Sequence, residues 1–164
     1  MATRLGVVQA AVYAAEEEAL AGAGMTWRRI EEARRYARLL IDREWFAERW
    51  PEFGRLHVER RSSGARYSTC AALDGPDPAP TGRPTGAVVL LAPGHLTQAV
   101  LLHELAHVLA EGDAGHGQGF LSTQLELVRQ EMGIMVWASY RAALARRPEL
   151  SGRAPIESDQ NVLP

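Results

Sequence analysis

The run His-Glu-Leu-Ala-His at positions 103–107 carries side chains that bind metals, and another histidine, His116, follows His107 by nine residues. Residues four apart lie on one face of an α-helix, so a helix here would present His103 and His107 together. This H-E-x-x-H pattern is typical of helices that bind zinc through both histidines. Glu104 then lies beside the metal, where its carboxylate can act as a general base. The pattern predicts a zinc-dependent hydrolase, with peptide bonds as the first substrate class to consider.

A catalytic zinc takes three protein ligands and leaves its fourth position to water. His103 and His107 supply two of the three. His116 lies in a glycine-rich turn between Gly115 and Gly117, where a histidine has little reason to be part of a core. We therefore favour His116 as the third ligand of one Zn²⁺ ion. Glu126 is the alternative, because it follows His107 by nineteen residues and falls on the next expected helix.

The chemistry expected of such a site is hydrolysis by an activated water. Zinc lowers the pKa of its bound water to about 7 and polarises a carbonyl group. Glu104 would accept the proton of that water and deliver it to the leaving amine. A further donor could stabilise the tetrahedral intermediate, and the sequence leaves four candidates open: Arg66, Tyr67, His95 and Tyr140.

The neighbouring elements are expected to hold the motif in place. Thr97 is a plausible N-cap for a helix that runs to about Glu111 and is apolar around the motif. The preceding run 87–92 reads as a strand. As a hypothesis, this strand is a sheet edge that binds an extended peptide through main-chain hydrogen bonds, near Val88 and Leu90.

The rest of the chain predicts an α+β fold. Helices are expected over 3–21, over about 26–48 with Thr26 as N-cap, and over about 118–146. The runs 55–61 and 65–73 read as a strand hairpin, and 74–86 reads as a proline- and glycine-rich loop. We expect one minimal zincin-like domain over 1–147: two N-terminal helices, about three strands, the metal helix and a long C-terminal helix. A loose tail would cover 148–164.

Charge, cysteine content and hydrophobicity argue against several classes of protein. The chain has 164 residues and a net charge of −2, which gives no general reason to expect nucleic acid as a partner. Its single cysteine, Cys70, excludes an internal disulfide and a cysteine zinc ribbon, and reads as a buried strand residue. No run approaches the roughly 20 apolar residues that span a bilayer. We expect a cytoplasmic protein that acts on a peptide or protein substrate, without a membrane partner.

The motif together with Gly115-His116-Gly117-Gln118-Gly119-Phe120 resembles the SprT-like zinc metallopeptidases. These carry H-E-x-x-H followed by a histidine in H-G-x-x-F or a close variant. The resemblance covers about residues 86–130. It implies His103, His107 and His116 as ligands, Glu104 as the base and Phe120 as a packing residue. The chain as a whole is also similar to a group of predicted actinobacterial metallohydrolases that share the motif.

The chain departs from the SprT-like pattern in two ways. Its gap to the third histidine is shorter than in many of these proteins, and it lacks the C-terminal zinc ribbon that many of them carry. Their link to proteins crosslinked to DNA is therefore not carried over. An alternative function is a non-catalytic binding module stabilised by a closed zinc site, in which Glu111 or Asp113 takes the place of water.

Overall fold

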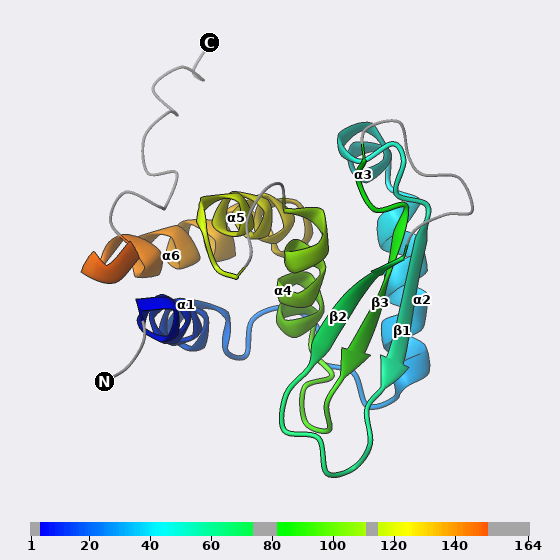
Figure 1. The fold of residues 1–164 in the computed structure, drawn as a ribbon, viewed down its shortest axis with the longest axis horizontal. Helices are drawn as coiled ribbons and strands as arrows, with labels where there is room; N and C mark the ends of the chain where they lie inside the picture. The colour runs from blue at the N-terminus through cyan, green and yellow to red at the C-terminus, as the bar shows by residue number, and fades with distance from the viewer. Residues whose placement is uncertain (1–3, 74–81, 111–114, 151–164) are drawn as a thin grey trace. The chain divides into compact units, whose positions relative to one another are not determined.

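The computed structural model describes residues 4–73, 82–110 and 115–150. Within these ranges the chain has six α-helices and a three-stranded mixed sheet, which confirms the α+β class (Figure 1). In chain order the elements are α1 (Arg4–Leu20), α2 (Ile30–Ile41), α3 (Glu44–Arg49), β1 (Arg55–Arg60), β2 (Thr69–Leu73), β3 (Gly86–Leu91), α4 (Gln98–Leu109), α5 (Gln118–Met132), α6 (Ile134–Ala145) and a 3₁₀ turn, η1 (Pro148–Leu150).

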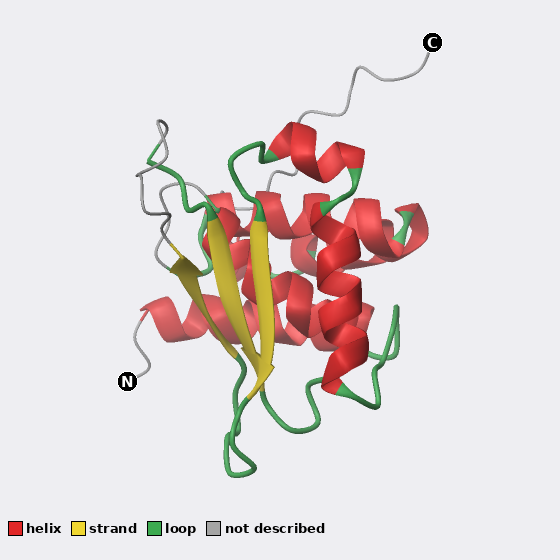
Figure 2. Cartoon of the chain, turned by 90° about the vertical axis from the view of Figure 1, so that its right-hand side faces the viewer, coloured by secondary structure: helices red, strands yellow, loops and turns green. Residues whose placement is uncertain are grey.

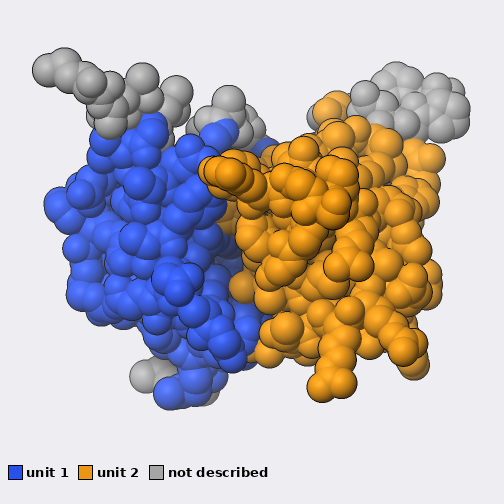
Figure 3. Space-filling view, turned by 90° about the horizontal axis from the view of Figure 1, so that it is seen from below, with its two compact units in different colours: residues 1–23, 110–164 blue, residues 24–109 orange. Residues whose placement is uncertain are grey.

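The chain divides into two compact units, coloured separately in Figure 3. The first combines the two ends of the chain, Met1–Ala23 and Ala110–Pro164, and contains α1, α5, α6 and η1. The second is the continuous segment Gly24–Leu109, which contains the sheet with α2, α3 and α4. Both units contain buried apolar side chains, among them Phe120 and Tyr140 in the first and Phe46 and Leu105 in the second.

The sheet of the second unit has the strand order β1-β3-β2 (Figure 2). β3 lies in the middle, parallel to β1 and antiparallel to β2. The predicted hairpin of 55–61 with 65–73 is therefore wrong, because β3 separates those two strands. The prediction that 87–92 forms a sheet edge is also wrong, since β3 has a neighbour on each side. None of the β3 residues is exposed, as its run of apolar residues predicts for a strand covered on both faces.

The expected helix over 26–48 is two helices, α2 and α3. The backbone leaves the helical region at Arg43, whose ψ is 136°. Thr26 does not cap α2, because it forms an isolated bridge with Thr97 and the N-cap residue is Arg29. The break lets Phe46 at 0% exposure and Trp50 at 5% turn into the interior, with ring centroids 4.8 Å apart. Burial of these aromatic rings stabilises the fold more than a continued helix would.

The helix that carries the motif, α4, packs against β2 and β3. Its start is capped as expected: the backbone N–H of Val100 donates to the Thr97 hydroxyl at 3.3 Å. A second anchor is Gln98, whose side chain accepts from the Met25 backbone N–H at 3.1 Å and donates to the Tyr36 hydroxyl at 2.9 Å. Gln98 is 1% exposed, so these bonds fix the first turn of α4 within the interior of its unit.

In the first unit α6 packs against both α1 and α5, and η1 packs against α1 and α6. The expected single helix over 118–146 is interrupted at Gly133, whose φ of +89° is readily adopted only by glycine. The buried hydroxyl of Tyr140 on α6 donates to Gln124 on α5 at 2.6 Å, and Gln124 in turn donates to Glu16 on α1. This chain of polar groups joins the three helices.

Several sequence predictions concern residues beyond the described ranges. Positions 74–81 of the expected 74–86 loop and positions 151–164 of the expected tail are among them. Within the described part of the tail, Pro148–Leu150 form η1, and Leu150 is 1% exposed. No helix in the described part of the chain is both long and apolar enough to cross a membrane.

Candidate metal centre

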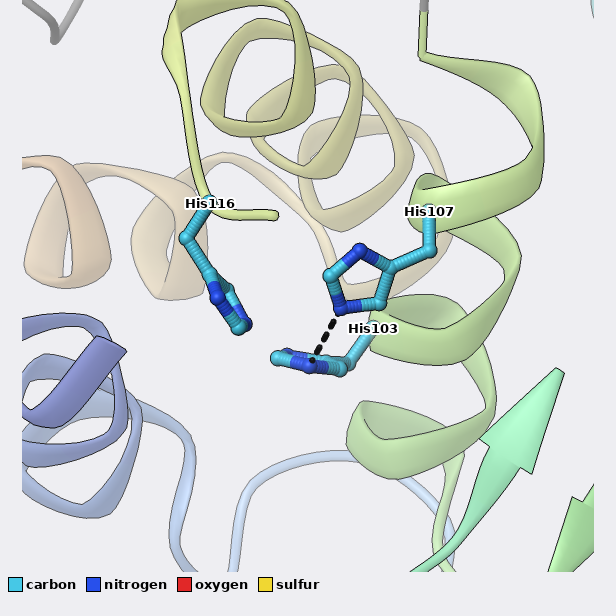
Figure 4. A group of neighbouring side chains, drawn as sticks. All are labelled: His103, His107 and His116. Carbon is cyan, nitrogen blue, oxygen red and sulfur yellow. Dashed lines mark hydrogen bonds between the residues drawn. The ribbon is translucent and has the colours of Figure 1, made fainter. Parts of the chain in front are cut away.

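Two histidine side chains on α4 face each other one helical turn apart. The Nε2 atoms of His103 and His107 are 3.2 Å apart, as the dashed line in Figure 4 marks. Two nitrogens that each bind a tetrahedral zinc at about 2.05 Å would lie about 3.3 Å apart. The observed separation therefore matches two ligands of one metal ion.

The environment of these histidines favours a defined ring orientation. His103 is 5% exposed, and its apolar neighbours on α4, Leu102, Leu105 and Ala106, are all 0% exposed. A helix whose back is buried in this way has little freedom to rotate, so its histidines are held in place before any metal binds.

His116 is presented by a turn that glycine makes possible. Gly115 has a φ of +97°, and Gly117 is the N-cap residue of α5. The His116 ring packs edge-on against Phe120, with centroids 4.6 Å apart, and against Tyr13 of α1 at 5.4 Å. Phe120 is 0% exposed, in agreement with the packing role expected of it. Two aromatic contacts therefore fix the orientation of the third imidazole.

The three imidazoles point toward one another in Figure 4. One ring nitrogen from each of His103, His107 and His116 lies within 4.8 Å of the others, close enough for the three to hold one metal ion. Among the described residues, these three histidines are the metal-binding side chains that form a group. Glu126 does not belong to this group. Glu111 and Asp113, the expected fourth ligands of a closed site, lie outside the described residues.

The candidate base, Glu104, is 9% exposed and has a sulfur neighbour that the sequence did not suggest. The thiol of Cys70 on β2 makes a hydrogen bond to the Glu104 carboxylate. Burial, the negative charge of Glu104 and this hydrogen bond raise the pKa of Cys70 to about 12. Cys70 is half-buried and protonated at neutral pH, which argues against a role as a reactive thiolate.

The four side chains considered as stabilisers of the tetrahedral intermediate lie in different surroundings. Tyr140 is 0% exposed, and its hydroxyl donates to Gln124, so it is committed to the interior of the first unit. Tyr67 is 70% exposed. His95 lies just before α4, with its Nδ1 atom 3.4 Å from the Ser68 hydroxyl oxygen. Arg66 is exposed. None of the four belongs to the group of three histidines.

No protein-family model, curated protein or solved structure matches the chain. Three imidazoles with no thiolate or carboxylate among them form a set that suits zinc and also copper, iron and nickel. The structure thus supports a metal centre of three histidines, with the ion to be identified by experiment.

Proposed function

We propose that this protein is a zinc-dependent peptidase of the H-E-x-x-H type, with a site that resembles that of the SprT-like enzymes. The observation that carries the proposal is the facing pair of Nε2 atoms on α4, 3.2 Å apart, joined by His116 in one group. Three histidine ligands would leave a fourth position open, as in catalytic zinc sites, whereas structural sites are filled by four protein ligands.

The residues present fit a zinc ion, since all three are imidazoles that can offer a ring nitrogen. When bound, zinc would act as a Lewis acid and make water a nucleophile at neutral pH. The protein's own part begins with Glu104, which directly follows the first histidine and is almost buried. Its carboxylate would accept a proton from the attacking water and return it to the amine nitrogen as the peptide bond breaks.

Removing the metal should abolish peptide hydrolysis. Protein dialysed against a chelator should lose activity on a quenched fluorescent peptide library, and one equivalent of Zn²⁺ should restore it, with metal content measured by mass spectrometry. The alternative of a closed, non-catalytic zinc module predicts another result. In that case zinc would bind at one equivalent and raise the melting temperature, but no peptide in the library would be cleaved.

A peptide that binds by strand addition needs a strand edge, and the sheet has two edge strands, β1 and β2. The β1 edge is partly covered by α2, because the Arg34 Nε–H donates to the Val58 carbonyl at 2.8 Å. The β2 edge lies beside the candidate base, since Cys70 of β2 contacts Glu104. We therefore propose that the substrate pairs with β2, and not with β3 near Val88 and Leu90.

The register indicates which β2 residues have main-chain groups that face outward. The Leu91 carbonyl accepts from the Arg61 N–H next to β1, whereas the Ala92 N–H donates to Ser68 on the β2 side. Successive residues of β3 thus alternate between its two neighbours. Leu90, Val88 and Gly86 then face β2, opposite Thr69, Ala71 and Leu73. The main-chain groups of Cys70 and Ala72 then face the other edge of β2, where no further strand lies among the described residues.

Changing Ala72 to proline should raise the KM for an extended peptide about tenfold, because it removes an outward N–H without removing a bond to β3. Ala72→Val is the matched control: it keeps the N–H and should bind peptide like wild type. Zinc content and circular dichroism would show that both variants fold. If the proline variant cleaved the peptide with an unchanged KM, β2 would not be the strand that pairs with the substrate.

A further inference from the structure

We propose that His95 is a substrate-binding residue: its Nε2–H group binds a carboxylate of the peptide that pairs with β2. This inference rests on the proposed peptidase function and names a substrate class for it, peptides that carry an acidic residue. His95 lies in the turn between β3 and α4, next to the residue that precedes β2.

The backbone around His95 is fixed by hydrogen bonds. Gly94 takes a left-handed conformation, with a φ of +82°, and the His95 N–H donates to the Ala92 carbonyl at 3.0 Å. The His95 carbonyl in turn accepts from the N–H of Thr97, which caps α4, at 2.9 Å. The imidazole is therefore carried by a well-defined turn, as a preorganised binding group requires.

A serine fixes the orientation of the ring. Ser68, which directly precedes β2, has its hydroxyl oxygen 3.4 Å from His95 Nδ1. The same oxygen accepts from the backbone N–H of Ala92 at 3.1 Å. Among the described residues the Ser68 hydroxyl proton has Nδ1 as its acceptor, so the neutral ring carries its own proton on Nε2.

The Nε2–H group is the part of His95 that is left for a ligand. It has no acceptor within the described part of the chain, and the residue is only half-buried. Nδ1 and Nε2 lie on different sides of the ring, so the Nε2–H points away from Ser68. The imidazolium form also carries a proton on Nε2, so the donor is present in both protonation states.

The charges at this end of the sheet favour an acidic ligand. β1 ends and β2 begins where β3 ends, so the loop between β1 and β2 lies at the same end of the sheet as His95 (Figure 1). The segments 60–73 and 86–103 together contain three arginines and no aspartate or glutamate. Arg66, one of the three, is exposed and lies two positions before Ser68. A carboxylate is the peptide group that suits a hydrogen-bond donor in positive surroundings.

Two contacts help to define this charge. Glu59, the acid that directly precedes the segment 60–73, forms an ion pair with Arg34 of α2, which offsets its charge. The Arg61 guanidinium donates to the Tyr67 carbonyl at 2.6 Å and so holds the loop before β2. The loop that leads into the proposed binding residue therefore has a positive net charge.

Matched peptides test the class of ligand. Capped hexapeptides with one glutamate at successive positions around the cleaved bond would be compared with the same set carrying glutamine. For wild type we expect one position at which glutamate lowers KM about tenfold, the scale of a hydrogen bond to a charged group. His95→Ala should lose this preference with kcat unchanged, whereas His57→Ala, an exposed change on β1, should keep it.

Nitrogen NMR of the imidazoles tests the donor without reference to activity. Above the usual titration range of histidine, His95 should carry its proton on Nε2, and Ser68→Ala should show a mixture of both tautomers. His95→Ala identifies the signals. The glutamate peptide should shift the Nε2 signal of the zinc-bound Glu104→Gln variant more than the glutamine peptide does. A wild-type ring with its proton on Nδ1 would overturn the inference.

The two proposals can fail separately. If zinc-bound wild type cleaves peptides without preferring glutamate, or His95→Ala keeps the preference, the carboxylate site is refuted and the peptidase function stands. If zinc-bound wild type cleaves no peptide, the proposed function is refuted, and the NMR titration decides on the binding site. A selective shift of the Nε2 signal by the glutamate peptide would then support that site, and equal or absent shifts would refute it.

Discussion

Replacing Glu104 with glutamine should lower kcat/KM for peptide hydrolysis about a thousandfold while leaving one zinc ion bound. General bases contribute factors of roughly 10² to 10⁴, and Glu104 is the carboxylate that directly follows the first histidine of the motif. Glutamine has nearly the same shape, so α4 should pack as before, but its amide cannot take a proton from water. Steady-state kinetics on a fluorescent peptide and metal analysis of the same sample provide the measurement.

The matched control is Glu17→Gln, the same chemical change at an exposed position of α1, which should leave kcat/KM unchanged. Thermal melting of both variants would exclude unfolding as the cause of a low rate. If Glu104→Gln cleaved peptide as fast as wild type, Glu104 would not be the base, although the three histidines could still bind zinc. Loss of zinc from this variant would instead show that the carboxylate is needed for metal binding.

Local sequence was enough to predict the elements that carry the motif. Thr97 followed by an apolar run marks the start of α4, and the four-residue spacing of His103 and His107 sets their common face. The glycines around His116 mark a turn, and the structure uses the left-handed conformation of Gly115 in that way. These features depend on neighbours within a few residues, so the sequence encodes them directly.

The arrangement of the sheet could not be derived in the same way. The runs 55–61 and 65–73 are separated by a turn signal, Ser62-Ser-Gly64, which favours a hairpin. Instead β3, which is further along the chain, lies between them. The continuous apolar run of β3 indicates a strand covered on both faces, but it does not say which strands pair with it. Pairing between strands is a long-range property, so local signals leave several orders possible.

The contact between Cys70 and Glu104 is the clearest case of a feature that sequence reasoning missed. The sequence predicts Cys70 as a buried strand residue, and the structure places it half-buried on β2. Its position beside Glu104 depends on β2 pairing with β3 and on α4 packing over both strands. No periodicity or spacing connects residues so far apart, and only the folded chain brings the thiol to the carboxylate.

Replacing His116 with alanine should weaken zinc binding at least about a hundredfold, whereas Glu126→Ala should leave it unchanged. Groups that only support a metal ligand contribute factors of 10 to 100 to affinity, so loss of a direct ligand should cost at least as much. His116 shares the group with His103 and His107, and Glu126 does not. Competition of each purified variant with a zinc-sensitive dye would give the affinities.

The pair of variants distinguishes the two ligand sets that the sequence left open. Both positions can be changed without removing the core around them: His116→Ala leaves the buried ring of Phe120 in place, and Glu126 is only half-buried on α5. His57→Ala, at an exposed histidine of β1, controls for unspecific zinc binding by imidazole. If Glu126→Ala released zinc and His116→Ala retained it, the third ligand would be a carboxylate. The site would then be a two-histidine, one-glutamate centre, as in thermolysin-type catalytic zinc sites.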